Sequence, residues 1–381
     1  MKCLFIHDAV FKRDEKGNLY NDGSFSEEVW ERYTNIFEEF TVVSRCEFIS
    51  SDLGEKFNFF DIGNKTFQEV ESITSARGIL RYKETKKIME AAIKDSECVI
   101  IRMPSFNGII AANICKRIKK PYVCEVVGCA WDSLRNYSNF GKIIAPIIYF
   151  LTKYYIYNAS DAVYITKCFL EERYPTKGNK YVCSNVLLKD VDNERIKTLT
   201  NDISISTIAA IDVKYKGQEY VIKALSYLRQ EGFLNDKNLN YYIVGPGNNT
   251  YLKDVAIKEN VLDLITFVGP IKHSEIYDFL DKIDIYIQPS LAEAQGRSLI
   301  EAMSRRCACL CSDVGGMVEL LPKNHIFERK NVVDLSNKII DCINNYSDFS
   351  SESFEGSLEF KQEIVNNKRK DILLRIKEKY E

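Results

Sequence analysis

Short, continuously apolar runs alternate with stretches of helical periodicity along most of this 381-residue sequence. Runs without polar interruptions are typical of strands buried on both faces, as in a parallel sheet covered by helices. In the first half, strands are predicted at residues 2–7, 40–44, 98–102, 122–127 and 161–165, and helices at 27–37, 108–118 and before 174–175. Ser26 is the expected N-cap of the first helix. The pattern predicts an α/β fold.

The second half repeats this pattern. Strands are predicted at residues 204–211, 241–244, 265–268 and 283–288, and helices at 218–230 and, capped by Ser274, up to residue 280. We therefore predict two Rossmann-like, doubly wound domains facing a central cleft, where the carboxyl ends of their strands meet. The expected parts are a first domain at 1–188, a polar linker at 189–202, a second domain at 203–355, and a closing helix within 356–381 that packs back on the first domain. The serine-rich residues 347–357 are expected to form a turn.

Composition and charge exclude several classes of function. The 52 basic and 54 acidic side chains give a net charge of −2, without the basic excess of a nucleic-acid-binding protein. The twelve cysteines form no C-x-x-C pair and there are three histidines, so no metal site is predicted. The chain starts with an apolar strand rather than a signal peptide, so we expect a cytoplasmic protein with reduced thiols. Cys307, Cys309 and Cys311 alternate along a predicted strand, which favours packing on one strand face over a redox role.

Residues 142–157 (KIIAPIIYFLTKYYIY) form a very apolar and aromatic segment. Its uninterrupted apolar run is shorter than the roughly 18–20 residues that a membrane span needs. One interpretation is a buried helix of the first domain. The other is a helix that contacts a membrane surface, where tyrosines and lysines are well accommodated, and it would place the protein at the inner face of the cell membrane.

Residues 284–321 (DIYIQPSLAEAQGRSLIEAMSRRCACLCSDVGGMVELL) carry the clearest chemical signal. A strand ends at 289–290, a loop with Glu293 and Gly296 follows, and a helix that begins at 297 or 298 carries Glu301. Gly296 allows a ligand to approach the backbone closely, and the first amides of the helix lack internal partners, so a phosphate can bind there. Glu293 can accept hydrogen bonds from sugar hydroxyls, and Glu301 from those of a ribose. The pattern therefore fits a nucleotide-sugar, whose two ends are joined by a diphosphate.

The same segment resembles the signature of the retaining glycosyltransferases of family four, which have the GT-B fold. The matching elements are Pro-Ser at 289–290, glutamates at 293 and 301, Glu-Ala-Met at 301–303 and Gly-Gly-x-x-Glu at 315–319. In the first domain, the stretches 126–128, 131–132, 174–176 and 184–186 look like those of bacterial capsule and surface-polysaccharide transferases. The resemblance implies that the first domain binds the acceptor and the second domain binds the nucleotide-sugar.

The resemblance also implies individual roles in donor binding. Glu301 would hold the ribose hydroxyls, and Glu293 would contact the donor sugar and act in catalysis. The backbone amides of Ala294, Gln295 and Gly296 would line the sugar and the diphosphate.

The family places an arginine and a lysine against the diphosphate, and this sequence departs from that pair. Lys216 matches the lysine, whereas the arginine position falls on Ala210 or Ile211, neither of which can serve. Lys214 is the candidate replacement. Gly245, which follows a strand, either lines the nucleotide pocket or forms an ordinary turn.

Candidates in the first domain are fewer. Gly23 lies in the turn 21–24, where relatives present a glycine loop to the diphosphate, and a plain turn is the alternative. Many relatives carry a histidine near 127–128 that is absent here, so Asp132 is the candidate catalytic group on the acceptor side. Arg102, at a strand end, and Trp131 are candidate acceptor-side residues.

Mechanism and function follow from these assignments. The Asp-x-Asp at 190–192 lies in the polar linker and not after a strand, so neither a metal ion nor another cofactor is expected. Backbone amides and lysines must then stabilise the negative charge of the departing diphosphate. By the resemblance, a hexose or N-acetylhexosamine moves with retention from a nucleotide-sugar, expected to be a UDP-sugar, to a glycan or lipid-linked glycan in bacterial surface-polysaccharide synthesis. Two alternatives remain open: a GT-B epimerase or hydrolase that needs no acceptor, and a non-catalytic nucleotide-sugar-binding subunit of a partner transferase.

Overall fold

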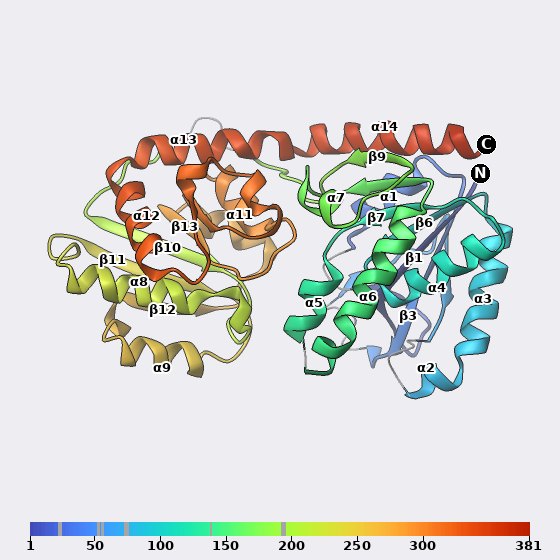
Figure 1. Ribbon diagram of the computed structural model, residues 1–381, viewed down its shortest axis with the longest axis horizontal. Helices are drawn as coiled ribbons and strands as arrows, with labels where there is room; N and C mark the ends of the chain where they lie inside the picture. Colours follow the sequence, from blue (N-terminus) through green and yellow to red (C-terminus); the bar gives the residue numbers. More distant parts are fainter. Residues whose placement is uncertain (22–24, 52–53, 55–56, 72–75, 138, 192–195) are drawn as a thin grey trace. The chain divides into compact units, whose positions relative to one another are not determined.

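The structure is a computed structural model that describes residues 1–21, 25–51, 54, 57–71, 76–137, 139–191 and 196–381 (Figure 1). The chain divides into two compact units, residues 1–183 with 366–381 and residues 184–365. The first unit was predicted to end at residue 188, and it ends at residue 183. The C-terminal segment that belongs to the first unit was predicted to begin at residue 356, and it begins at residue 366. Gly23 lies outside the described residues.

The first unit is built on a nine-stranded sheet within the described residues, with parallel strands in the order β5-β3-β1-β6-β7-β8-β9. The strand β1 is long: its first half pairs with β6, and its far end pairs with the antiparallel β2, which β4 extends. The strands are β1 (Lys2–Arg13), β2 (Leu19–Asn21), β3 (Glu39–Phe48), β4 (Asn58–Phe59), β5 (Lys65–Glu69), β6 (Cys98–Met103), β7 (Val123–Val126), β8 (Asp161–Tyr164) and β9 (Asn179–Val182).

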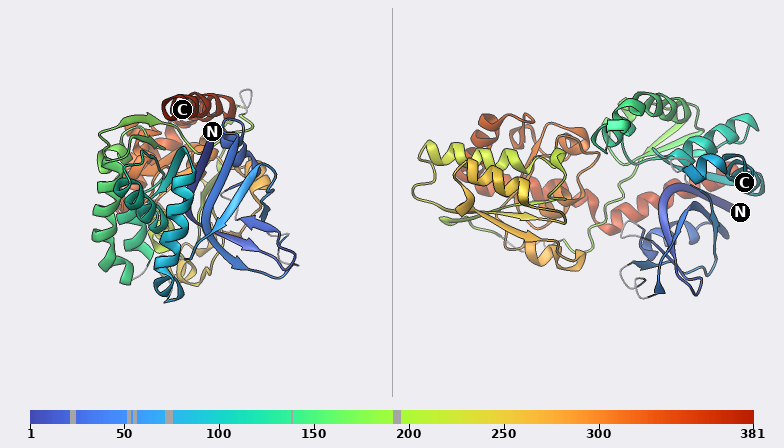
Figure 2. Two further views of the ribbon diagram at one scale, coloured as in Figure 1. Left: turned by 90° about the vertical axis from the view of Figure 1, so that its right-hand side faces the viewer. Right: turned by 90° about the horizontal axis from the view of Figure 1, so that it is seen from below.

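Helices pack on both faces of this sheet because successive side chains of a strand point to opposite sides (Figure 2). On one face, the ring of Phe5 lies 5.6 Å from that of Trp30 in α1. On the other face, the hydroxyl of Tyr122 donates to the backbone carbonyl of Tyr155 in α6 at 2.6 Å. The helices are α1 (Glu27–Thr34), α2 (Ala76–Leu80), α3 (Tyr82–Asp95), α4 (Phe106–Arg117), α5 (Ala130–Tyr137), α6 (Asn139–Tyr157), α7 (Phe169–Arg173) and most of α14 (Gln362–Tyr380).

The second unit contains a parallel sheet in the order β12-β11-β10-β13-β14-β15. From β10 the chain moves outward through β11 and β12, then returns to β13 beside β10 and moves outward in the opposite direction. This reversal between β10 and β13 is the topological switch point of a doubly wound sheet, where ligands of such folds bind. The strands are β10 (Asp202–Ile208), β11 (Asn238–Val244), β12 (Ile265–Gly269), β13 (Ile285–Gln288), β14 (Ala308–Ser312) and β15 (Ile326–Phe327).

Two apolar layers enclose the second sheet. One contains Ile205, Tyr241 and Ile285 with residues of α8, α9 and α12. The other contains Tyr286 with residues of α10 and α11. The helices are α8 (Gln218–Gln230), α9 (Thr250–Lys258), α10 (Ile276–Leu280), α11 (Arg297–Ser304), α12 (Val332–Asn344) and α13 (Tyr346–Ser357), with 3₁₀ turns η2 (Lys214–Lys216), η3 (Leu262–Leu264), η4 (His273–Glu275), η5 (Gly315–Glu319), η6 (Lys323–His325) and η7 (Leu358–Phe360).

The alternating cysteines belong to the second of these layers. Cys307, Cys309 and Cys311 are fully buried on the face that packs against α11, and all three are free thiols. Burial raises the pKa of the Cys309 thiol well above its usual value. The packing interpretation is confirmed.

The serine-rich segment is a helix, α13, so the turn predicted at 347–357 is wrong. Phe349 and Phe354 bury their rings, and the small serines between them let the helix lie close to its neighbours. Ser353 Oγ accepts a hydrogen bond from the amide of Cys309 at 3.1 Å, and Ser350 Oγ donates to the carbonyl of Arg306 at 2.9 Å. The polar composition therefore reflects contacts with backbone groups rather than solvent exposure.

Two capping predictions have different outcomes. Ser26 occupies the N-cap position of α1, although its side chain makes no capping hydrogen bond. Ser274 lies within η4, and α10 begins two residues later at Ile276, so the capping role predicted for Ser274 is wrong.

The helix α6 is only partly buried, which corrects the interpretation of 142–157 as a buried helix. Gly141, Ala145 and Ile156 face the interior of the first unit, whereas a row of large apolar side chains faces outward. Within the described ranges, no helix combines the length and the apolar character that crossing a membrane requires.

Candidate functional site

Two loops meet at the switch point of the second sheet, one following β10 and the other following β13. The amide of Leu291 donates to the carbonyl of Tyr215 at 2.7 Å. Gly217 has a φ of +78°, and a Cβ atom there would lie 1.9 Å from the carbonyl oxygen of Pro289. Glycine is therefore required where the two backbones cross.

The loop 289–296 is held on its other side by the turn that follows β14. Gly315 has a φ of +62°, and a Cβ atom there would lie 1.7 Å from the carbonyl oxygen of Glu293. The amide of Gly316 donates to the carbonyl of Ala294 at 2.8 Å. The predicted Gly-Gly turn thus fixes the backbone that carries Glu293.

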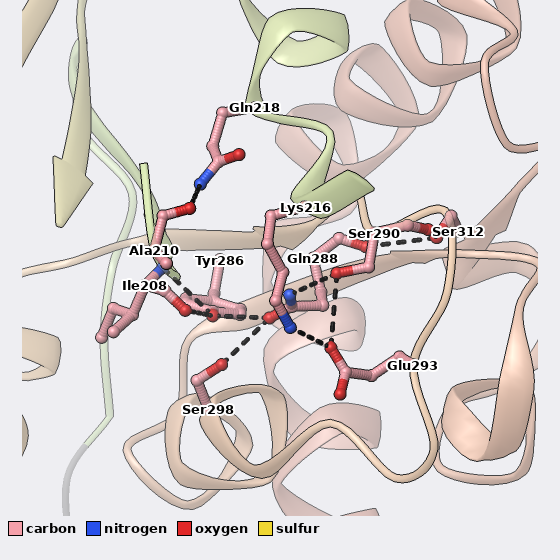
Figure 3. Close-up of polar contacts among 10 residues, drawn as sticks. All are labelled: Ile208, Ala210, Lys216, Gln218, Tyr286, Gln288, Ser290, Glu293, Ser298 and Ser312. Atoms are coloured by element: carbon pink, nitrogen blue, oxygen red, sulfur yellow. Dashed lines mark hydrogen bonds and ion pairs between the residues drawn. The ribbon is translucent and has the colours of Figure 1, made fainter. Parts of the chain in front are cut away.

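The structure brings Lys216 and Glu293 together. The ammonium of Lys216 lies 2.7 Å from Oε2 of Glu293, and each side chain is 21% exposed (Figure 3). The pair joins η2, after β10, to the loop after β13. It places one cation and one carboxylate beyond the carboxyl ends of the central strands β10 and β13, where both side chains are partly shielded from water. Such a pair can exchange its internal contact for a ligand that carries both negative charge and hydroxyl groups.

A row of polar side chains connects the end of β13 to Glu293 through hydrogen bonds, and it was not predicted from the sequence. Tyr286 and Ser298 each donate to Oε1 of Gln288, at 2.8 and 3.0 Å. Gln288 Nε2 donates to Ser290 Oγ at 2.9 Å, and Ser290 Oγ donates to Glu293 Oε2 at 3.5 Å (Figure 3). A glutamine and a serine at the end of an otherwise apolar strand were the sequence feature that could have indicated this polar row.

Glu301 lies in α11, the helix that starts after Gly296. Its side chain is 6% exposed, and its Oε1 lies 3.3 Å from Nε2 of His273, which is 72% exposed. The hydrogen bond with Glu301 raises the pKa of the His273 imidazole. Gly296 has a φ of +82° and precedes the free amides of the first turn. His273 was not singled out by the sequence, which gave no sign that η4 lies beside α11.

The remaining candidates of the second unit have identifiable local roles. Gln295 accepts a hydrogen bond from Ser184 Oγ at 3.1 Å. Gly245 has a φ of +147°, and a Cβ atom there would lie 2.0 Å from the carbonyl oxygen of Ala209, so glycine is needed where the ends of β10 and β11 approach each other.

Lys214, the candidate replacement for the missing arginine, lies on the same turn as Lys216 but points elsewhere. Its ammonium lies 4.2 Å from the ring centroid of Tyr251 in α9. The two lysines of η2 therefore have separate partners.

The candidates of the first unit lie at strand ends or in α5. Arg102 Nη1 is 4.0 Å from Glu125 Oε2, and the guanidinium also lies over the ring of Phe25. Asp132 Oδ2 is 3.6 Å from Arg173 Nη1. The Trp131 ring packs edge-on against Tyr149 of α6 at 6.0 Å and carries Arg135 on its face.

Comparison with known proteins identifies the family. Residues 192–370 match the model of the family described as glycosyl transferases group 1. Protein CapJ of Staphylococcus aureus is 36% identical over 348 residues, which cover 89% of this chain and 85% of CapJ. The chain belongs to the glycosyl transferases of group 1. The resemblance drawn from the motif is thereby confirmed at the level of this family, and the protein is a glycosyltransferase.

Solved structures agree on the fold of this glycosyltransferase. Anabaena HepE, solved in complex with UDP-glucose, superposes with a TM-score of 0.64 at 14% identity and covers 98% of this chain and 99% of HepE. WaaG, a glycosyltransferase involved in lipopolysaccharide biosynthesis, superposes with a TM-score of 0.64 at 13% identity, over 98% of this chain and 99% of WaaG. The predicted GT-B fold is confirmed.

Proposed function

We propose that this glycosyltransferase moves a hexose or N-acetylhexosamine from a UDP-sugar to a glycan or lipid-linked glycan acceptor in bacterial surface-polysaccharide synthesis. The contact between Lys216 and Glu293 carries the proposal, because it places a cation and a carboxylate on adjacent loops at the switch point. Two fold relatives support the class of substrate: HepE was solved with UDP-glucose, and WaaG is involved in lipopolysaccharide biosynthesis.

Donor binding exchanges the internal ion pair for contacts with the ligand. A diphosphate carries more negative charge than one carboxylate and competes well for the ammonium of Lys216. Glu293 is then released to accept hydrogen bonds from hydroxyls of the sugar. Glu301 accepts hydrogen bonds from the ribose, and the amides that follow Gly296 bind phosphate oxygens.

The reaction breaks the bond between the anomeric carbon and the diphosphate oxygen and forms one from that carbon to the acceptor oxygen. Lys216 and the amides stabilise the charge that develops on the diphosphate. The departing diphosphate takes the proton of the acceptor hydroxyl on the face from which it leaves, so the anomeric configuration is retained. No step of this proposal uses a metal ion.

The test incubates the purified chain with a panel of nucleotide-sugars and a lipid-linked acceptor, with and without EDTA, and determines the anomeric configuration of the product by NMR. We expect transfer from a UDP-sugar with retention, at a rate that EDTA leaves unchanged. Consumption of the donor without acceptor would contradict transfer and favour an epimerase or hydrolase. Donor binding without turnover would favour a non-catalytic subunit.

A further inference from the structure

The outward face of α6 is a continuous apolar stripe. Its large side chains recur every three or four residues and so lie on one side of the helix, and their exposed fractions range from 36% to 72%. They extend along about 26 Å of the helix axis. The stripe consists of Phe140, Ile143, Ile147, Phe150, Leu151, Tyr154 and Tyr157. The helix lies at the outside of its unit in Figure 2.

The stripe is hollowed along its second half. A shallow groove of about 620 Å³ is lined by Ile147, Phe150, Leu151, Lys153, Tyr154 and Tyr157, and its lining is almost entirely apolar. Contiguous exposed apolar surface of this kind marks a site of interaction, because isolated exposed apolar residues are common but rows of them are not.

The charged residues of α6 and α4 are all basic, whereas Asp132 of the neighbouring α5 and Glu90 beside α4 are paired with Arg173 and Arg117. Residues 139–157 contain two lysines and no acidic residue, and residues 106–124, which include α4, contain four basic residues and no acidic one. The ammonium of Lys116 lies 4.1 Å from the ring centroid of Tyr154, and that of Lys177 lies 5.8 Å from the ring of Tyr157. Cations therefore flank the aromatic end of the stripe.

We propose that α6 docks this protein on an anionic phospholipid bilayer, with the helix lying in the plane of the interface and its stripe inserted among the acyl chains. Tyrosine and lysine suit this depth because their apolar parts enter the lipid while their polar ends stay at the headgroups. A second copy of the chain fits less well, because a two-fold contact through α6 would place the same lysines against one another. This inference does not depend on the proposed transfer reaction.

The experiment measures co-sedimentation of the full chain with vesicles of phosphatidylcholine alone and with about 30% phosphatidylglycerol. Wild-type protein is expected to bind the anionic vesicles and to dissociate as salt is raised. The variant Ile143→Ser/Ile147→Ser should lower the partition coefficient at least tenfold, by a rough estimate from the apolar area lost. Lys142→Gln/Lys153→Gln should reduce the preference for anionic over neutral vesicles.

The matched control is Ile257→Ser/Val333→Ser, which removes two exposed aliphatic side chains from the second unit and should bind like wild type. Unchanged circular dichroism and unfolding temperature show that each variant is folded. Wild-type protein that stays in the supernatant, or an Ile143→Ser/Ile147→Ser variant that binds as well as wild type, overturns the proposal. A concentration-dependent dimer without vesicles, abolished by the same variant, overturns it in favour of self-association.

Discussion

Two ion pairs of equal length in the second unit differ in position: one lies in the candidate site and the other on the surface of a helix. Lys216 and Glu293 lie 2.7 Å apart and join two loops at the switch point, whereas Lys223 and Glu219 lie 2.7 Å apart within one face of α8. An i,i+4 pair on a helix contributes only a few tenths of a kcal/mol. The first pair connects the backbone of two loops that a ligand would contact.

We therefore predict that Glu293→Gln lowers kcat by about 10²–10³-fold, because the variant keeps the shape of the side chain but loses the charge that contacts the donor sugar in the proposed reaction. Glu219→Gln should stay within about twofold of wild type. Steady-state transfer assays with both variants provide the measurement. Equal rates for Glu293→Gln and wild type would show that the carboxylate has no part in the reaction.

We predict that donor binding depends on pH through His273. The hydrogen bond with Glu301 raises the pKa of His273 in the folded protein. Below the unfolded pKa of about 6.5 the imidazole is protonated, and its pairing with Glu301 contributes fully to stability. This contribution is lost as the pH rises through the higher folded pKa. If Glu301 holds the ribose, UDP affinity should rise about twofold to fivefold over the same interval, a small change because His273 is largely exposed. Titration calorimetry from about pH 6 to 8.5 measures it. A His273→Gln variant with the same pH dependence would rule out this residue as the cause.

The sequence predicted some of these contacts and could not predict others. Glycine positions and the spacing of Glu293 and Glu301 are local features, and a loop before a helix start can be recognised from them. The support of Glu293 by Gln288 and Ser290, and the contact of Glu301 with His273, depend on which segments become neighbours. Strand order decides this, and a single sequence does not encode strand order in any local pattern.

At the scale of elements, a buried charged cluster attaches α14 to the rest of the first unit. Arg369 donates to Glu125 Oε1 at 3.2 Å and to the carbonyl of Cys183 at 3.2 Å, and the hydroxyl of Tyr33 donates to the same carboxylate oxygen at 2.6 Å. Both Arg369 and Glu125 have 3% exposed side chains. Removal of either charge takes the nearest ionic partner from the other, which stays buried; for Glu125 the next cation is Arg102, 4.0 Å away.

We predict that Glu125→Gln and Arg369→Gln each destabilise the first unit by about 3–5 kcal/mol. The double variant Glu125→Leu/Arg369→Leu should lose less than the sum of the two, because neither charge is left behind. Thermal or urea unfolding of the full chain gives these values. Glu171→Gln, which removes an exposed pair with Lys180, is the control and should change stability by less than about 0.5 kcal/mol. Additive losses in the double variant would show that the two groups act separately.

Strands were predictable because burial on both faces leaves a continuous apolar run, as in β6 and β13. Short strands such as β2 and β4 carry no such run and were missed. Helix α13 was also missed, because its serines resemble a turn until their hydrogen bonds with backbone of the strand β14 and of Arg306 are known. The exposed apolar stripe of α6 could not be located from the sequence, because the helix is apolar on most sides and the sequence does not show which side packs against the rest of the unit.

For the molecule as a whole, each unit has its own sheet and its own buried apolar residues, so we expect unfolding in more than one transition. If the second unit binds UDP, calorimetry should show UDP raising only the transition of that unit. At 100 times Kd, the shift should be about 5–10 °C. Glu301→Gln should reduce it. A UDP-induced shift of the other transition alone would place nucleotide binding on the first unit.

The first unit takes residues from both ends of the chain, and this has a consequence for biosynthesis. Residues 366–381 are translated after the entire second unit, so roughly 10–40 s separate the emergence of residue 183 from that of residue 366 at typical elongation rates. During that interval the carboxylate of Glu125 has no Arg369 to meet it, and the nascent first unit depends on other contacts until translation ends.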